Sequence, residues 1–400
     1  MADHSMGQTP LSMRMTIAVF GRTNSGKSSL INAITGQQVS LVSKIGGTTT
    51  DPVNKAMELY PIGPCVFVDT AGFDDDTELG ALRMDRTRKV LDKTDLAILV
   101  TDGADNGEEL EPWMAEIKKR GMVAIGVLNK SDLLESPESK AADLTKKFQI
   151  PFSYASAMNG DGVERVKAAI VERAPQDFEM PSIVGHLIEE GDSVLLVMPQ
   201  DIQAPKGRLI LPQVQVTRDL LDHGAVVISA TTDKMCAALE KLAKPPKLII
   251  TDSQVFSYVY EHKPEDSLLT SFSVLMARYK GDIAEYIRGA NRLDTLKETD
   301  RVLIAEACTH QPLDGDIGRI KIPNLLRKVY GENLAIDVVN GSNFPENLSE
   351  YALIVHCGGC MFNRRYVLNR IRAAREQNTA ITNYGILIAK LNGILDKVVY

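Results

Sequence analysis

The last third of the chain holds three cysteines and two histidines in a pattern that could bind a metal. Cys308 and His310 form the stretch CTH, and His356, Cys357 and Cys360 form HCGGC. A redox dithiol would use only the C-x-x-C pair. A zinc site with three cysteines and one histidine, or an iron–sulfur cluster held by three or four thiolates, would use most of the set. The spacing alone leaves zinc and iron–sulfur open.

A second group of residues, near the N-terminus, could bind phosphate. The stretch GRTNSGKS, residues 21–28, follows the apolar run MTIAVF and precedes a helical pattern, so it matches a phosphate-binding loop. Gly21 and Gly26 let the backbone curl so that N–H groups point at phosphate oxygens. Lys27 adds positive charge for the β- and γ-phosphates, and the hydroxyl of Ser28 is suited to bind Mg²⁺.

Three later segments, each after an apolar run, narrow the nucleotide to GTP. VFVDTAG ends in Asp69, which is expected to hold Mg²⁺ through water, and in Gly72, whose amide would reach the γ-phosphate. AIGVLNKSD carries Asp132, whose carboxylate can accept hydrogen bonds from N1–H and the 2-amino group of guanine, a donor pair that adenine lacks. SYASAMNG adds backbone groups for the guanine O6. The predicted GTP-binding residues are Asn24, Ser25, Gly26, Lys27, Ser28, Ser29, Gly72, Asn129, Lys130, Asp132, Ser156 and Ala157.

These motifs in this order resemble a Ras-like G domain of the class that includes the tRNA-modifying GTPase TrmE and Era. The stretch SKIGGTTTD, residues 43–51, is similar to the first switch loop of that class. The resemblance implies that Thr49, with Ser28 and Asp69, serves Mg²⁺ and that Asn24 binds K⁺. Phe73 stands where Ras has a glutamine that orients water. We therefore expect slow GTP hydrolysis that K⁺ stimulates more than Na⁺.

Bulk properties exclude several classes of protein. The net charge of −7 argues against a broad nucleic-acid surface. Five cysteines, an odd number spread along 400 residues, argue against a disulfide framework and favour a reducing cytoplasm. The N-terminus does not read as a secretory signal, and no apolar run is long enough for a membrane span. We expect a cytoplasmic protein that binds neither nucleic acid nor membrane.

The pattern of helices and strands that would position these residues predicts an α/β protein of three domains. They are a Ras-like P-loop G domain (13–175), a small α/β domain (180–265) and a third α/β domain (266–400). The middle domain lacks a cluster of catalytic residue types, which favours a role in dimerisation, and its Cys236 reads as a core thiol. In the third domain, strands alternate with helices, which predicts a mainly parallel sheet. Two of its strands end near Cys308 and Cys357, so the thiols are expected to converge at one sheet edge.

The whole chain resembles the HydF family of [FeFe]-hydrogenase maturation GTPases. The pattern CTH…HCGGC and the stretch SFSVLMARYKGD carry the resemblance in the last third. It implies a [4Fe–4S] cluster on Cys308, Cys357 and Cys360, with His310 and His356 as candidate fourth ligands or hydrogen-bonding neighbours. It also implies a homodimer that holds the diiron subcluster precursor for the [FeFe]-hydrogenase apo-protein, with radical-SAM maturases as partners. The alternative is a tRNA-modification or ribosome-assembly GTPase with a C-terminal zinc module.

Overall fold

The computed structural model describes residues 9–36, 53–70, 89–104, 106–175, 182–200, 209–307, 316–341 and 343–400. Thr49, Gly72, Phe73, Cys308 and His310 lie outside these residues. The chain divides into two compact units, one over residues 1–179 and the other over 180–400.

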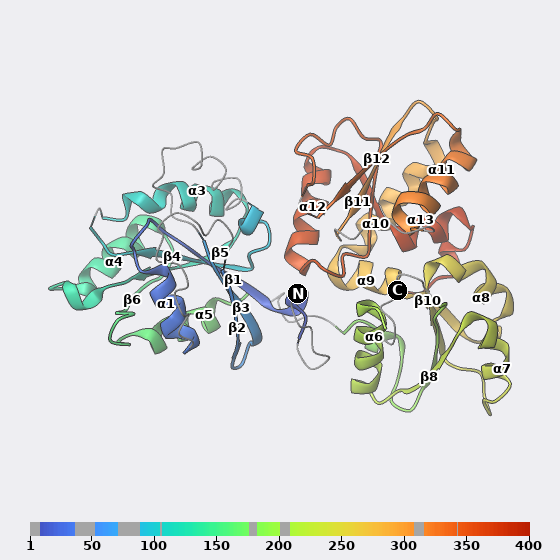
Figure 1. Cartoon of the computed structure of the whole chain (residues 1–400), viewed down its shortest axis with the longest axis horizontal. Coiled ribbons are helices and arrows are strands. Elements are labelled where there is room, and N and C mark those ends of the chain that lie inside the picture. The colour runs from blue at the N-terminus through green and yellow to red at the C-terminus, as the bar shows by residue number, and fades with distance from the viewer. Residues whose placement is uncertain are drawn as a thin grey trace. The chain divides into compact units, whose positions relative to one another are not determined.

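The first unit is built on a six-stranded sheet in the order β2-β3-β1-β4-β5-β6, in which only β2 runs antiparallel to its neighbour (Figure 1). Helices α1 and α5 cover one face and α3 and α4 the other, as two separate apolar clusters show. The strands are β1 (Met15–Phe20), β2 (Val53–Leu59), β3 (Gly63–Asp69), β4 (Leu96–Thr101), β5 (Val123–Leu128) and β6 (Phe152–Tyr154). The helices are α1 (Lys27–Thr35), α3 (Glu111–Lys119), α4 (Pro137–Phe148) and α5 (Val163–Arg173).

The second unit contains two parallel four-stranded sheets. The first has the order β10-β9-β7-β8, with β7 (Ser193–Val197), β8 (Val226–Ala230), β9 (Leu248–Thr251) and β10 (Leu268–Ser271). Its helices are α6 (Leu211–Asp222), α7 (Met235–Leu239) and α8 (Phe256–His262). Since β10 pairs with β9, residues that the sequence assigned to the last domain complete the middle sheet. The expectation that Cys236 is a core thiol is wrong, because α7 is a short helix that leaves this residue exposed.

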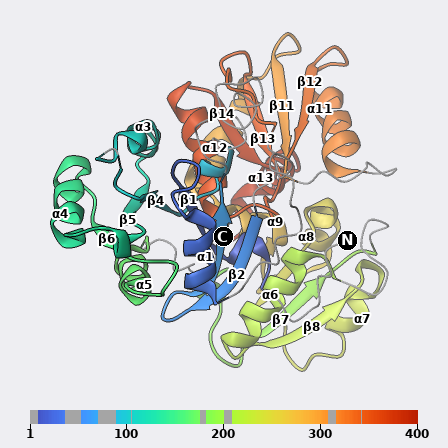
Figure 2. The same cartoon turned by 60° about the vertical axis from the view of Figure 1, so that its left-hand side comes forward.

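The second sheet of this unit has the order β12-β11-β13-β14, and its strands lie together in Figure 2. They are β11 (Arg301–Glu306), β12 (Ala335–Asn340), β13 (Leu353–His356) and β14 (Ala380–Asn383). The helices are α9 (Phe272–Lys280), α10 (Ile283–Ala290), α11 (Ile322–Tyr330), α12 (Arg364–Glu376) and α13 (Tyr384–Leu391). One apolar core runs from the middle sheet into this one, so the two sheets of the second unit share a hydrophobic interior. The predicted fold class, α/β with mostly parallel sheets, is confirmed.

Candidate functional site

The phosphate loop joins the buried strand β1 to α1. Gly26 is the N-cap of α1 and has a φ of 88°, in the left-handed region that glycine tolerates best. A Cβ at this position would lie 2.2 Å from Nδ2 of Asn129, so the loop needs glycine for close approach as well. The ammonium of Lys27 donates to the carbonyl oxygens of Gly21, at 2.9 Å, and Arg22, at 2.8 Å. The side chain of Lys27 therefore lies against the phosphate loop itself.

Two residues predicted to serve Mg²⁺ are brought into contact. The hydroxyl of Ser28, in the first turn of α1, donates to Oδ2 of Asp69 at the end of β3. Burial raises the pKa of Asp69, and the hydrogen bond from Ser28 and the positive charge of Lys27 act in the opposite direction. A hydroxyl and a carboxylate are the oxygen ligands that Mg²⁺ prefers.

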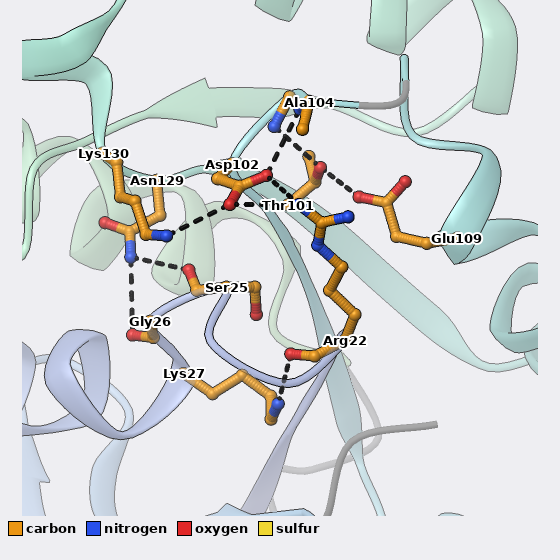
Figure 3. A network of polar contacts seen from close by, with 11 residues as sticks. Arg22, Ser25, Gly26, Lys27, Thr101, Asp102, Ala104, Glu109, Asn129 and Lys130 are labelled. Atoms are coloured by element: carbon orange, nitrogen blue, oxygen red, sulfur yellow. Dashed lines mark hydrogen bonds and ion pairs between the residues drawn. The ribbon is translucent and has the colours of Figure 1, made fainter. Parts of the chain in front are cut away.

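Asn129 connects the phosphate loop to the base-binding loop. Its side-chain Nδ2 donates to the carbonyl of Ser25 at 3.0 Å and more weakly to that of Gly26 at 3.4 Å, as Figure 3 shows. Its Oδ1 accepts from the amide of Ala157 at 3.1 Å. Asn129 is 1% exposed, so these bonds are shielded from water. The residue therefore fixes the distance between two of the predicted GTP-binding segments.

Asp102, which belongs to none of the sequence motifs, contacts two residues of the predicted nucleotide site. It follows β4, and Figure 3 shows it between Lys130 and Arg22. Lys130 Nζ lies 3.1 Å from Oδ2, and an Arg22 guanidinium nitrogen lies 3.1 Å from Oδ1. Burial acts to raise the pKa of Asp102, but the hydrogen bonds from Lys130 and Ala104 and the charge of Arg22 outweigh it, so the pKa is lowered. The apolar run LAILVT before this aspartate was the signal that could have revealed it.

The residues predicted to contact the guanine base follow the ends of β5 and β6. Asp132 is exposed, so its carboxylate is accessible to a ligand, whereas Ser156 is buried. The amide of Ser131 donates to the carbonyl of Ala155 at 3.1 Å, which joins the two loops. Three further predicted residues of the phosphate loop, Asn24, Ser28 and Ser29, are exposed.

In the second unit, the C-x-x-C loop begins where β13 ends. β11 and β13 are parallel neighbours, and the amide of Cys357 donates to the carbonyl of Ala305 at 3.0 Å. Sγ of Cys357 accepts from the amide of Ala307 at 3.0 Å and from that of Gly359 at 3.4 Å. Ala307 is the residue immediately before Cys308. Burial raises the pKa of the Cys357 thiol to about 11, although the two amide hydrogen bonds lower it.

His356 is fully buried and both its ring nitrogens have partners. Nδ1 lies 2.7 Å from the carbonyl oxygen of Cys357, and Nε2 lies 3.0 Å from a guanidinium nitrogen of Arg370. Since a guanidinium can only donate, Nε2 is the acceptor and Nδ1 carries the proton. Burial, together with the charge of Arg370, lowers the pKa of His356 to about 3. The imidazole is neutral and engaged within the protein.

Two cations from the surrounding helices bind the backbone of this region. Lys280, the last residue of α9, donates to the carbonyl oxygens of Gly359, Cys360 and Phe362. Burial lowers the pKa of Lys280 to about 8, although Cys360 and Cys357 act to raise it. Arg364, the first residue of α12, donates to the carbonyls of Tyr279 and Gly281 at 2.8 and 3.1 Å.

Within the described ranges, which do not include Cys308 and His310, no three His, Cys, Asp or Glu side chains are grouped closely enough to hold a metal ion. None of the helices in the described part of the chain has the length and apolar character needed to cross a membrane.

Comparison with protein families gives matches over most of the chain. Residues 284–400 match the model of the hydrogen maturase F tetramerization domain, and residues 183–281 match that of the hydrogen maturase F dimerization domain. Together these two domains span more than half of the 400 residues. Residues 16–130 match the model of the 50S ribosome-binding GTPase. These matches confirm the predicted GTPase domain and support oligomerisation of the chain.

Curated relatives match the first unit. GTPase Der of Campylobacter fetus subsp. fetus (strain 82-40) is 37% identical over 165 residues, which are 39% of this chain and 35% of that protein. GTPase Der of Gemmatimonas aurantiaca is 37% identical over 169 residues, which are 38% of this chain and 37% of that protein. The chain thus spans about a third of the length of these relatives. Among solved structures, the G domain of the T. maritima FeoB iron transporter is 24% identical with a TM-score of 0.33, covering 40% of this chain and 98% of that one.

Proposed function

The chain belongs to the hydrogen maturase F family, and from that premise we propose that it is a GTP-hydrolysing scaffold for hydrogenase maturation. In this proposal it holds the precursor of the diiron subcluster and delivers it to the apo-protein of [FeFe]-hydrogenase, and radical-SAM maturases build that precursor. The G domain would control which partner is bound. The proposal places the protein in a reducing cytoplasm, where its thiols persist.

The contacts of the phosphate loop support GTP binding and hydrolysis. The N–H groups of the loop would donate hydrogen bonds to the phosphate oxygens of a bound nucleotide. The ammonium of Lys27, which now donates to two carbonyl oxygens, would donate to phosphate oxygens instead. Ser28, Asp69 and Thr49 would hold Mg²⁺, and the ion would neutralise negative charge on the phosphates. Asp132 would select guanine, and the amides that follow Asn129 and Ser156 would complete the base pocket. Gly72 would contact the γ-phosphate.

We propose that Asn24 contributes to a K⁺ site beside the phosphates. Asn24 is exposed on the phosphate loop and has a φ of 63°. Its carbonyl oxygen suits a hard monovalent cation. A cation at this place would supply the positive charge that an arginine finger supplies in other GTPases, which would make hydrolysis slow in Na⁺ and faster in K⁺.

We propose that Cys308, Cys357 and Cys360 hold a [4Fe–4S] cluster. The observation that carries this proposal is the 3.0 Å hydrogen bond from the amide of Ala307 to Sγ of Cys357. It brings the residue before Cys308 against a thiol that is 50 positions away in sequence. Backbone N–H groups on a cysteine sulfur stabilise a thiolate ligand, so the donors around Cys357 fit a cluster. The cluster would supply an iron with a labile position for the incoming diiron unit.

For the fourth position on the cluster, the contacts of His356 favour His310 over His356. Both nitrogens of the His356 ring are bonded to Cys357 and Arg370, and a ligand role would break one of these bonds. We propose that His356 orients the cysteine loop, as hydrogen-bonding neighbours of metal ligands commonly do.

We propose that the protein is a homodimer through residues 183–281, the segment that matches the dimerization domain. The edge strand β8 leaves Val226 55% exposed at its start, which an interface would cover. Light scattering of the full chain at several concentrations measures this: a monomer at every concentration would contradict the proposal.

The cluster proposal is tested by anaerobic reconstitution with iron and sulfide, followed by metal analysis and EPR. We expect about four iron and four sulfide per chain, the composition that defines the cluster, and loss of both in Cys357→Ser and Cys308→Ser. Cys236→Ser is the matched control, because this exposed thiol lies outside the cysteine loop. One tightly held zinc and no iron would favour the tRNA-modification or ribosome-assembly alternative.

A further inference from the structure

The ammonium of Lys280 is unusual because it is almost completely buried. Lys280 is 1% exposed at the end of α9, a helix in which seven of nine residues are buried. Charged lysines are almost never fully buried unless they are paired, because removing an ammonium from water carries a large desolvation penalty. A buried lysine at this place therefore needs a compensating group.

The hydrogen bonds of Lys280 all go to one loop. Nζ donates to the carbonyl of Phe362 at 2.7 Å, to that of Cys360 at 3.1 Å and to that of Gly359 at 3.3 Å. An ammonium has three N–H donors, so these bonds account for all of them. The carbonyls belong to Cys360 itself, to the residue before it and to the second residue after it, so the lysine fixes the backbone that presents Cys360.

The three carbonyls satisfy the donors of Lys280 but do not neutralise its charge. Within the described part of the chain, Lys280 forms no ion pair with a carboxylate, and the groups that act electrostatically to favour its charged form are Cys360 and Cys357. A second cation, Arg370, is 3% exposed and donates to His356, the neighbour of Cys357. Two buried cations near a thiol pair make a site that favours an anionic occupant.

We propose that Lys280 is a positioning residue that holds the Cys357–Phe362 loop and stabilises the reduced state of the metal cluster bound there. This inference rests on the proposed cluster function. A cluster with three thiolate ligands is anionic, and one-electron reduction adds a further negative charge. A fixed cation close by therefore favours the reduced form and raises the reduction potential.

The test is the reduction potential of the reconstituted full-length protein, measured by EPR during titration with dithionite, which supplies the electron. In Lys280→Met we expect the ratio of reduced to oxidised cluster at a fixed potential to fall about tenfold, which for one electron corresponds to 59 mV. Lys280→Gln keeps a hydrogen-bond donor without the charge and should show the same fall. Lys280→Arg keeps the charge and should remain within about threefold of the wild type.

Lys263→Met is the matched control. Its Nζ also donates to three backbone carbonyls, those of Pro264, Glu265 and Ser267, but in a loop of the middle sheet. It should leave the potential of the cluster unchanged. A wild-type potential in Lys280→Gln, or an equal shift in Lys263→Met, would overturn the inference. If Lys280→Met does not fold, as circular dichroism would show, the Gln and Arg variants decide it.

The two proposals fail in different ways. If the wild type binds no iron, the cluster function is wrong and the role of Lys280 fails with it. If the wild type binds the cluster but its potential does not depend on the charge at position 280, only the inference about Lys280 is wrong.

Discussion

Asn129→Ala tests whether the structure identifies the residue that connects the two halves of the nucleotide site. The side chain is 1% exposed and makes bonds of 3.0 Å to Ser25, 3.1 Å to Ala157 and 3.4 Å to Gly26. A typical buried hydrogen bond contributes about 1 kcal/mol net, and a buried group left without a partner costs about 1–3 kcal/mol. With two good bonds and one weak bond, we expect the G domain to lose about 3 kcal/mol of unfolding free energy.

The chain offers a direct assay for this loss. Its single tryptophan, Trp113, is 2% exposed in the core of the first unit, so its fluorescence reports unfolding of the G domain within the full chain. Without nucleotide, urea unfolding should shift to lower concentration by about 1–3 M, because the urea dependence for a domain of this size is about 1–3 kcal/mol per M.

Asp132→Ala is the control for Asn129→Ala. Asp132 is exposed, so its loss should change the unfolding free energy by no more than about 0.5 kcal/mol. It should nevertheless weaken GTP binding about 100-fold or more, because two hydrogen bonds to a charged acceptor are lost. If Asn129→Ala unfolds at the wild-type urea concentration, or Asp132→Ala is equally destabilised, the structural role assigned to Asn129 is wrong.

Three further predictions each concern one residue. Asn24→Ala should hydrolyse GTP at equal rates in K⁺ and Na⁺, measured by phosphate release, and a retained preference for K⁺ would remove Asn24 from the cation site. Asp102→Asn should cost about 1 kcal/mol at pH 7, since its partners are partly exposed. Because the pKa of Asp102 is lowered by folding, its contribution is complete above the unfolded pKa of about 3.9 and is lost as the pH falls through the folded value, so urea unfolding of variant and wild type should converge in acid. His356→Asn should keep the iron content and EPR g values of the reconstituted protein, whereas a changed g pattern would indicate that His356 is a ligand.

The GTPase domain was predictable from the sequence, because the residues proposed to bind the nucleotide lie in short motifs that follow apolar strands. The structure brings two of these residues, Ser28 and Asp69, into contact. Asp102 was not predicted, because a single aspartate after a strand forms no motif. Its ion pairs are made with Arg22, which follows β1, and Lys130, which follows β5, and the linear sequence does not show that these residues lie close together.

The second unit was less predictable. β10 has only four residues, LLTS, and the charged stretch before it suggested a domain boundary at 265. The pairing of β10 with β9 is a tertiary contact that local pattern does not encode. Cys236 was misassigned because an amphipathic pattern does not determine whether a helix as short as α7 buries a given face.

Lys280 was not found from the sequence because a lysine before glycine reads as an ordinary solvent-facing end of a helix. The signal was the composition of α9, FSVLMARYK, in which apolar residues occupy nearly every side of the helix. A helix buried all round cannot expose its last side chain without a path to water, so its charged residues must find partners inside the protein. That reasoning identifies a buried lysine but not the loop that it binds.

The phosphate loop and the cysteine loop meet the same physical requirement in similar ways. A backbone that turns its N–H groups toward an anion directs carbonyl oxygens to the opposite side, because the two groups of a planar trans peptide point in opposite directions. Those carbonyls need donors if they are buried. Asn129 donates to the phosphate loop, and Lys280 donates to the cysteine loop. The amides of Ala307 and Gly359 meanwhile reach Sγ of Cys357. In both loops buried donors hold the carbonyl side of the backbone, which leaves N–H groups available to the anionic ligand proposed for each site. This arrangement is the reason to expect a charge-dependent cluster potential rather than a merely structural lysine.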